Sequence, residues 1–351
     1  MKVVAGLLAL VTAACGSPSK SDSAAKGSPG VDGVDAPAVE LRLGYFPNVT
    51  HAAAVAGVEK GIFTEALGSD VTLKPATFNA GPAAIEALFS GALDATYIGP
   101  NPAINAFAKS DGRAIRIIAG ATSGGAFLVV NPKITKASDL KGKKLATPQL
   151  GNTQDVALRA WLADQGFKTN LQGGGDVSVV PQENAQILEQ FKSGAISGAW
   201  VPEPWATRLV QEGNGKVFVD ERTLWPGGQF VTTHLIVRTE FLKEHPQAVE
   251  KLLIGHLKAT EFVNREPAEA QTVVNAGIER ITSKAIPQPV IAAAWNNLSF
   301  TFDPVASSLK KGAADAKTIG LLDADTKLDG IYDLAMLNKL LAASGQAEVK
   351  G

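Results

Sequence analysis

Cysteine is almost absent from the sequence, because Cys15 is the only one among 351 residues. A single cysteine excludes a disulfide within the chain and any cysteine-rich metal site. An excess of either charge is missing too: the formal net charge is −1, and neither lysine nor arginine forms a long block. Since nucleic-acid binding needs a concentrated basic face, we expect no nucleic-acid partner.

Apolar runs long enough to cross a membrane are also lacking. The stretch 3–11 follows Lys2 and is about half the length of a membrane-spanning helix. It leads into Thr12-Ala13-Ala14-Cys15, and this order of a positive end, a short apolar segment and small residues is typical of a cleaved export signal. We therefore predict that residues 1–15 are a signal and that the mature protein lies outside the cytoplasmic membrane.

The position of Cys15, directly after small residues, resembles the lipobox of bacterial lipoproteins, although Thr12 stands where that family most often has Leu. The resemblance implies an acyl group on Cys15 that anchors the protein to the cell membrane. The alternative is a cysteine that lies incidentally in an ordinary cleaved signal. Residues 16–38 are mostly Ser, Gly, Pro, Ala, Lys and Asp, and such a composition cannot offset its ordering entropy by burial. We expect a flexible tether there.

The rest of the chain, about 310 residues, is long for one hydrophobic core and suits two lobes. Strand-like and helical patterns alternate along its first part. This alternation predicts an α/β fold with a mainly parallel sheet covered by helices. The predicted strands are 41–45, 71–77, 95–98 and 115–119, and the predicted helices are 52–61, 82–90 and 102–109.

The same order recurs further along the chain. Residues 85–98 match residues 188–201 at a constant offset, including Ser-Gly-Ala in both. Shared physical constraints explain part of this agreement, but two similar βα units remain, so we predict two lobes with a cleft between them. The second set comprises strands 144–147, 177–181 and 198–201 and helices 155–165, 185–193 and from 204 onward. With crossings at 124–130 and 229–237, the predicted parts are 39–130 (lobe 1), 131–230 (lobe 2) and 231–351 (return to lobe 1).

Ligands of open α/β sheets bind beyond the carboxyl ends of the strands, where helix N-termini offer unpaired N–H groups. The loops at these positions are built of small or polar residues, which is also what ordinary strand-to-helix turns use. Five such loops on one side of two matching units favour a binding site, with Asn48 or Thr50 and Asn101 as possible helix caps. These loops are 46–51, 78–82, 99–102, 148–154 and 202–205.

Two residues of these loops, Glu203 and His51, leave alternatives open. Glu203 could pair with a cationic group of a zwitterionic ligand or could satisfy the dipole of the next helix. His51 could contact a ligand or serve in capping and packing. Trp205, like Phe46, would supply an apolar wall for the organic part of a ligand.

The chain resembles the solute-binding proteins of ABC transporters, in particular the group for aliphatic sulfonates, taurine and nitrate. The resemblance implies a two-lobed type II periplasmic-binding fold that closes on its ligand and delivers it to a permease. It rests on Tyr45-Phe46-Pro47-Asn48 with His51, on Gly99-Pro100-Asn101-Pro102-Ala103, on the segment from Leu150 to Asp155 and on Glu203-Pro204-Trp205.

The same resemblance implies the residues of the ligand site, where backbone N–H, hydroxyl and amide groups would hold the head of a sulfonate. No arginine lies in these loops, so dipoles would meet most of the ligand's charge. The protein would be a monomer that binds an alkanesulfonate or taurine without a metal or cofactor. The predicted residues are Phe46, Asn48, His51, Asn79, Gly99, Pro100, Asn101, Gly151, Asn152, Thr153, Gln154, Glu203 and Trp205.

Other functions remain as alternatives. The same scaffold could bind nitrate, bicarbonate or a thiamine-pyrimidine precursor, or could present its ligand to a chemosensory receptor instead of a permease. An enzyme of the pyrimidine-synthase type shares the fold but looks to need a cysteine-rich iron-binding segment, and Cys15 is the only cysteine. Residues 173–175 are glycines but lack the Lys and Ser/Thr of a phosphate-binding loop, so we expect a surface turn there.

Overall fold

The computed structural model describes residues 38–351. The predicted signal, the lipidation of Cys15 and nearly all of the predicted tether lie outside this range. Within residues 38–351, no helix is both long and apolar enough to cross a membrane.

The first lobe is built on a six-stranded sheet in the order β11-β4-β10-β3-β1-β2. Strand β1 pairs in parallel with β2 and β3, whereas β10 runs antiparallel between β3 and β4, and β11 pairs antiparallel with β4. The strands are β1 (Val39–Tyr45), β2 (Val71–Thr77), β3 (Ala95–Ile98), β4 (Ile115–Gly124), β10 (Val231–Arg238) and β11 (Leu298–Phe300).

The second lobe is built on a five-stranded sheet in the order β7-β6-β8-β5-β9. Strand β6 pairs in parallel with β7 and β8, and β5 runs antiparallel between β8 and β9. The predicted two-lobed α/β fold is therefore confirmed: in each sheet most strands run in one direction, whereas β10 and β11 in the first sheet and β5 in the second run the opposite way. The strands are β5 (Ala126–Val130), β6 (Lys144–Thr147), β7 (Ser178–Pro181), β8 (Gly198–Pro202) and β9 (Lys216–Asp220).

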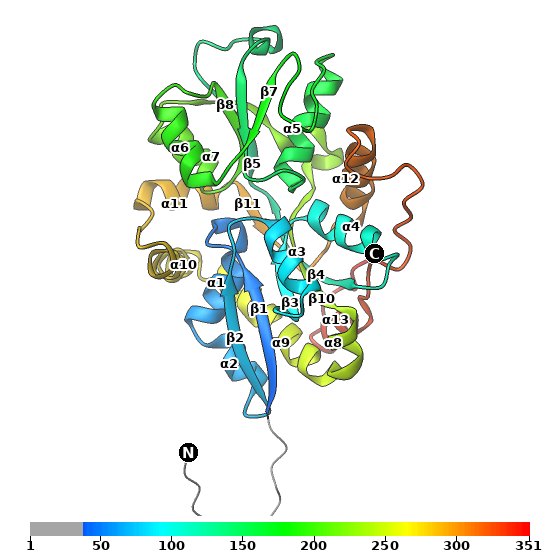
Figure 1. Ribbon diagram of the computed structural model, residues 1–351. Coiled ribbons are helices and arrows are strands. Elements are labelled where there is room, and N and C mark those ends of the chain that lie inside the picture. Colours follow the sequence, from blue (N-terminus) through cyan, green and yellow to red (C-terminus); the bar gives the residue numbers. More distant parts are fainter. Residues whose placement is uncertain (1–37) are drawn as a thin grey trace, which may run out of the picture. The chain divides into compact units, whose positions relative to one another are not determined.

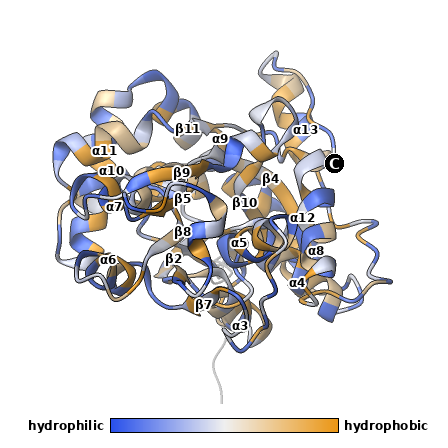
Figure 2. Cartoon of the chain, turned by 90° about the horizontal axis from the view of Figure 1, so that it is seen from above, coloured by the Kyte–Doolittle hydropathy of each residue, from blue (hydrophilic) through white to orange (hydrophobic). Residues whose placement is uncertain are grey.

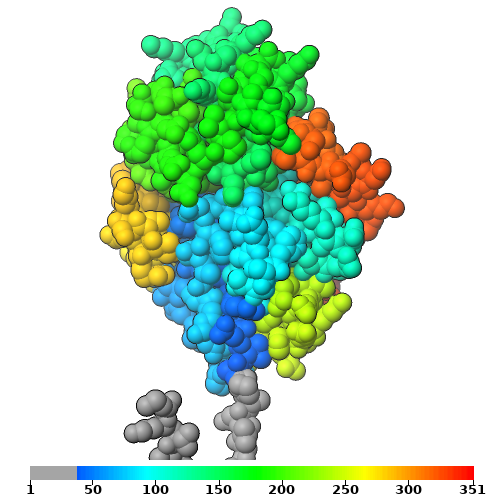
Figure 3. Space-filling view, in the orientation of Figure 1, coloured from blue at the N-terminus to red at the C-terminus, as the bar shows by residue number. Residues whose placement is uncertain are grey.

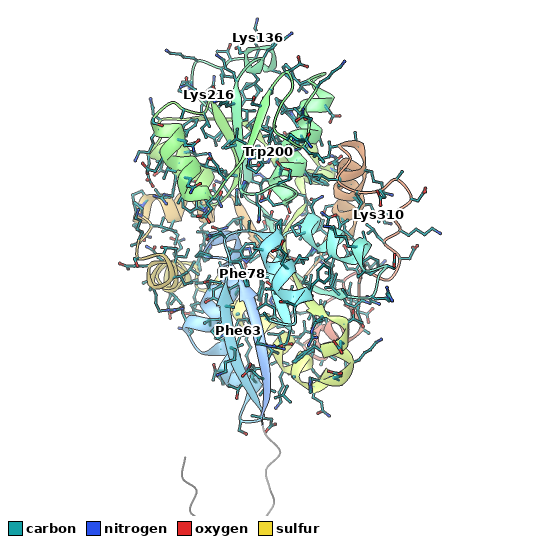
Figure 4. All side chains as sticks on the ribbon, viewed as in Figure 1. Phe63, Phe78, Lys136, Trp200, Lys216 and Lys310 are labelled. Carbon is teal, nitrogen blue, oxygen red and sulfur yellow. The ribbon has the colours of Figure 1, made fainter. Side chains whose placement is uncertain are left out.

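Helices cover both faces of each sheet (Figure 1). In Figure 2 the central strands are largely orange, while blue segments lie on the surrounding helices and loops. Phe63 and Trp200, labelled in Figure 4, are fully buried in the cores of the first and second lobe. The helices are α1 (Ala52–Glu59), α2 (Ile62–Leu67), α3 (Gly81–Phe89), α4 (Pro100–Lys109), α5 (Thr153–Asp164), α6 (Asn184–Lys192), α7 (Trp205–Gln211), α8 (Thr239–Glu244), α9 (Pro246–Arg265), α10 (Pro267–Thr282), α11 (Gln288–Trp295), α12 (Ala306–Thr318) and α13 (Ala335–Ala343).

The chain crosses between the lobes at Gly125. Strand β4 ends at Gly124 in the first sheet and β5 begins at Ala126 in the second, so this crossing precedes the predicted boundary at residue 130. Gly125 has a φ of 72°, and a Cβ added there would overlap the side chain of Leu298. Glycine meets both demands, since it accepts a positive φ and has no side chain. The return crossing lies between β9 and β10, which re-enters the first sheet.

The C-terminal part of the chain contacts both lobes. Strand β11 extends the first sheet by pairing with β4. However, α11 contacts α7 and α12 contacts α5, and both α5 and α7 belong to the second lobe. Figure 3 shows α12, in orange, against the green residues of the second lobe and the cyan residues of the first.

Candidate ligand-binding site

A small cavity lies between the two lobes, with a volume of about 30 Å³. A buried water needs about 10–15 Å³ on this measure, so the cavity has room for two or three such positions. None of the lining side chains is Lys, Arg, Asp or Glu. The lining residues are Phe46, Asn48, Thr50, His51, Asn79, Ala80, Gly81, Gly99, Pro102, Pro148, Asn152, Thr153, Gln154, Asn184, Pro202, Thr232 and Thr233.

Four helix N-termini meet at this cavity. Helices α3 and α4 bring Gly81 and Pro102 from the first lobe, and α5 and α6 bring Thr153 and Asn184 from the second. The N–H groups of a first helical turn have no partner within their helix, and the N-terminus carries a partial positive charge. The cavity therefore has a positive potential without a cationic side chain, which suits an anion.

His51 contributes a neutral imidazole to the first-lobe side. The residue is 3% exposed, and burial lowers the pKa of its ring to about 3. The backbone N–H of Phe46 donates to Nδ1 of His51 at 3.3 Å, and the two rings lie 4.4 Å apart. Because Nδ1 accepts, the single proton of the neutral ring is on Nε2.

On the second-lobe side, the loop before α5 is fixed by its own hydrogen bonds. Oδ1 of Asn152 accepts from the backbone N–H of Asp155 at 2.9 Å and so caps the helix, while its Nδ2 donates to Oε1 of Gln154 at 3.1 Å. The buried carboxylate of Asp155 accepts from Gly151 N at 3.0 Å and pairs with Arg159 at 3.0 Å. This network holds the loop in place before any ligand arrives.

Two polar side-chain atoms at the cavity are buried and have no hydrogen-bonding partner within the described chain. They are Oγ1 of Thr153 and Oδ1 of Asn184, in the first residues of α5 and α6. Buried polar groups in folded proteins nearly always have a partner. The hydroxyl of Thr153 can donate to a ligand in the cavity, whereas Oδ1 of Asn184 can only accept a hydrogen bond.

Hydrogen bonds join the lobes around the cavity. Trp205 Nε1 in the second lobe donates to Asn48 Oδ1 in the first at 2.9 Å, and Asn79 Nδ2 donates to Glu183 Oε1 at 2.9 Å. The lobes are therefore in contact on the two sides of the cavity that Asn48 and Asn79 line.

The structure brings eight of the thirteen predicted ligand residues to the cavity and leaves five outside its lining. The eight are Phe46, Asn48, His51, Asn79, Gly99, Asn152, Thr153 and Gln154. The five are Pro100, Asn101, Gly151, Glu203 and Trp205.

Asn101 corrects a sequence-based expectation. It lies inside α4 rather than at its cap, and its Nδ2 donates to the carbonyl of Gly312 in α12 at 3.0 Å. Pro100 only begins this helix, and Gly151 donates its N–H to Asp155. The backbone of Asn48 precedes a 3₁₀ helix (Val49–His51), but its side chain does not cap it.

Glu203 is also turned away from the cavity. Its carboxylate is fully buried and accepts from Thr207 N at 3.1 Å, from Thr207 Oγ1 at 2.8 Å and from Asn297 Nδ2 at 2.6 Å. Burial raises the pKa of this carboxyl. Of the two roles considered for Glu203, this geometry matches an interaction with the start of the following helix, α7. The hydrogen bond from Asn297 also ties α7 to the C-terminal part of the chain.

Nine residues of the lining are not among the thirteen predicted ligand residues, although six of the nine lie within the five predicted loops. Asn184 begins α6 as Gly81 begins α3, so the internal repeat contains a signal that could have found it. Thr232 and Thr233 lie near the start of β10, and Thr233 Oγ1 donates to the carbonyl of Thr50 at 3.1 Å. The nine are Thr50, Ala80, Gly81, Pro102, Pro148, Asn184, Pro202, Thr232 and Thr233. Among residues 38–351, no group of three or more His, Cys, Asp or Glu side chains is placed to hold a metal ion.

Known proteins resemble the chain in sequence and in fold. The model of the NMT1-like family matches residues 35–278. A protein of Brucella abortus (strain 2308), named only as a binding protein, is 24% identical over 287 residues, which are 81% of this chain and 84% of that protein. The taurine-binding periplasmic protein of Escherichia coli (strain K12) is 30% identical over 207 residues, or 58% of this chain and 62% of that protein.

Solved structures share the fold. The alkanesulfonate-binding protein SsuA of Xanthomonas axonopodis pv. citri, bound to MOPS, superimposes with a TM-score of 0.69 at 19% identity, and covers 86% of this chain and 100% of its own. The binding proteins that match in sequence or structure include sulfonate, taurine, nitrate and bicarbonate binders. The chain therefore belongs to the NMT1-like family, and its relatives and structural neighbours include solute-binding proteins of the sulfonate, taurine and nitrate group.

Proposed function

We propose that the protein is the solute-binding component of an ABC importer, and that it captures an alkanesulfonate or taurine between its lobes. The observation that carries this proposal is the uncharged cavity at four helix N-termini, with the unpartnered hydroxyl of Thr153. It is a binding protein rather than an enzyme in this proposal, and a permease with its ATPase receives the ligand.

The charge of the site supports a singly charged oxyanion. Helix N-termini supply a partial positive charge and N–H donors, and no carboxylate lines the cavity to repel an anion. Phe46, in the lining, supplies an apolar surface for the organic part of the ligand. Donors come from both lobes, so a ligand that bridges them stabilises the closed form.

Nitrate or bicarbonate is the second candidate, and the small volume of about 30 Å³ is the observation that favours it. A cavity of this volume encloses a whole nitrate or bicarbonate ion, whereas it would enclose only the head group of a sulfonate. Relatives of the chain include a bicarbonate-binding protein and a nitrate-binding protein. The residues proposed to contact either ligand are the eight predicted ones in the lining, joined by Thr50 and Asn184.

Thermal unfolding in a panel of ligands tests the proposal. The panel contains methanesulfonate, ethanesulfonate, taurine, sulfate, nitrate, bicarbonate and a thiamine-pyrimidine precursor. A ligand at a hundred times its Kd stabilises the folded state by about 2.7 kcal/mol, which raises the melting temperature measurably. We expect sulfonates to give the largest shift. A shift with bicarbonate or nitrate alone would replace sulfonate by the second candidate, and a shift only with the pyrimidine precursor would remove the oxyanion proposal.

We further propose that an acyl group on Cys15 and residues 16–38 as a tether hold a monomer outside the cytoplasmic membrane. Metabolic labelling with an alkyne fatty acid tests the anchor. The expected result is a labelled, membrane-associated protein and an unlabelled, released Cys15→Ala variant. Equal fractionation of the two forms without label would contradict it.

A further inference from the structure

The hydrogen bonds of three cavity side chains use their acceptor atoms. Oδ1 of Asn48 accepts from Trp205, Oε1 of Gln154 accepts from Asn152, and Nδ1 of His51 accepts from the backbone of Phe46. The atoms left for a ligand are Nδ2 of Asn48, Nε2 of Gln154 and Nε2 of His51. All three are N–H donors.

Obligate donors fix these orientations. An indole N–H and a backbone N–H can only donate, so the atom that meets each of them must be an acceptor. Trp205 therefore sets the amide of Asn48, and the N–H of Asp155 sets the amide of Asn152, which in turn sets Gln154. Rotating either amide by 180° would bring two donors together.

The three orientations have different origins in the fold. Those of Gln154 and His51 come from their own loops, a few residues away in the sequence. The orientation of Asn48 comes from Trp205, 157 positions away and in the other lobe. Trp205 is also held from its own helix, because the guanidinium of Arg208 lies 4.8 Å from its ring.

We propose that Trp205 is a specificity-determining positioning residue: by holding Oδ1 of Asn48 across the cleft, it makes Asn48 present only an N–H donor to the closed site and so disfavours a ligand that would place an O–H group there, while Oδ1 of Asn184 stays an acceptor elsewhere in the cavity. This proposal rests on the proposed function and goes beyond it, because it names a residue outside the cavity lining that sets the ligand class. In the open form the amide of Asn48 is free to rotate, so the selection is made on closure.

Methanesulfonate and the methylphosphonate monoanion form a matched pair of probes, since they have nearly the same shape and charge but the phosphonate carries one O–H. Calorimetric titration gives the Kd of both for the wild-type protein, Trp205→Phe and Asn297→Ser. Trp205→Phe keeps a ring beneath Arg208 and removes only the N–H donor. Asn297→Ser removes a different hydrogen bond, the one from Asn297 to Glu203, which ties the C-terminal part of the chain to the second lobe. Neither of these two residues lines the cavity.

We expect Trp205→Phe to lower the preference for methanesulfonate over methylphosphonate about tenfold, because the freed amide of Asn48 can turn its Oδ1 to accept from the O–H of the phosphonate. Asn297→Ser should weaken both ligands by the same factor. An equal loss of affinity for both ligands in Trp205→Phe would overturn the proposal and would mean that Trp205 only holds the lobes together. Unchanged affinity for both ligands would overturn it as well. If the wild-type protein bound neither probe nor any other oxyanion, the proposed function itself would fail.

Discussion

The two lobes share a topology but differ in how each prepares its half of the cavity. The order β2-β1-β3-β10-β4 of the first sheet corresponds to β7-β6-β8-β5-β9 of the second, with the antiparallel strand in the same place. In the second lobe, Asn152 and Gln154 are oriented by partners in their own loop. In the first lobe, Asn48 and Asn79 have partners in the second. The two lobes are therefore alike in topology, but the amides of the second lobe are oriented by their own loop, whereas those of Asn48 and Asn79 are oriented when the lobes close.

The largest effect is expected where the second lobe holds its own loop. Replacing Asp155 by Asn leaves the buried guanidinium of Arg159 without its charge partner, 3.0 Å away, and weakens the bond from Gly151. Breaking one partner of a buried ion pair costs about 3–5 kcal/mol, so the free energy of unfolding from urea titration should fall by that amount.

A second ion pair with the same spacing provides the control. Arg208 and Glu212 are also four residues apart on a helix of this lobe, but both are partly exposed. Glu212→Ala should cost less than about 1 kcal/mol. Equal losses for the two variants would show that the loop before α5 does not depend on the buried pair.

The first lobe differs in its response to acid, because the second lobe contains no histidine between residues 131 and 230. Burial lowers the pKa of His256 to about 4, while the unfolded chain binds its proton near pH 6.5. The unfolded state therefore gains protons first, and stability is present above pH 6.5 and lost as the pH falls towards 4. His256→Gln should reduce the drop in unfolding free energy between pH 7 and pH 5 by about 2 kcal/mol.

Urea titrations at both pH values measure this difference. His256→Gln also loses bonds to Tyr97 and Gly120, so its stability at pH 7 falls as well and only the difference between the two pH values is informative. An unchanged difference would mean that folding does not shift the pKa of His256.

Gly99 and Thr153 are where the lobes meet most closely at the cavity. A Cβ added at Gly99 would overlap Oγ1 of Thr153, although the φ of −69° at Gly99 suits any residue. Gly99→Ala should therefore leave the unfolding free energy unchanged but keep the lobes from closing, with an expected loss of ligand affinity of at least about tenfold, or 1.4 kcal/mol. Calorimetric titration with the best ligand of the panel measures it.

A double-mutant cycle isolates this contact. Thr153→Ala removes Oγ1, so Gly99→Ala should cost little affinity in a Thr153→Ala background. The same tenfold loss of affinity in both backgrounds would show that the methyl group added at Gly99 does not act through Oγ1 of Thr153. Small-angle scattering with saturating ligand should show closure for Gly99→Ala/Thr153→Ala and not for Gly99→Ala alone.

Much of the fold follows from local patterns in the sequence. The bounds of β2, β3 and β6 agree with their predicted ranges, because each strand is a short apolar or alternating run with a loop on either side. The direction of β5 and β10 could not be predicted, since it depends on pairing with strands far along the chain. The sequence places the first crossing only within 124–130 and does not single out Gly125, because the apolar pattern looks alike on its two sides.

The candidate site divides in the same way. Predicted residues between the end of a strand and the first turn of the next helix, such as Gly99 and Thr153, line the cavity, because the carboxyl ends of the strands set their place. Asn101 and Glu203 follow strands too, but their side chains turn to Gly312 and Asn297. Those partners belong to the C-terminal part of the chain, and no local pattern reveals that it packs there.

The smallest effect on ligand affinity is expected at Glu203, which lies where the two lobes meet but outside the lining of the cavity. Its oxygens accept from Thr207 and Asn297, so the carboxylate has no free oxygen directed at an ammonium group in the cavity. Glu203→Gln should change the ratio of the Kd values for taurine and ethanesulfonate, which differ by one amino group, by less than about twofold, because any loosening of the contact with Asn297 affects both ligands equally. A tenfold loss for taurine alone in calorimetric titration would place the ammonium beside Glu203 and give the second lobe a cation-binding role that its counterpart lacks.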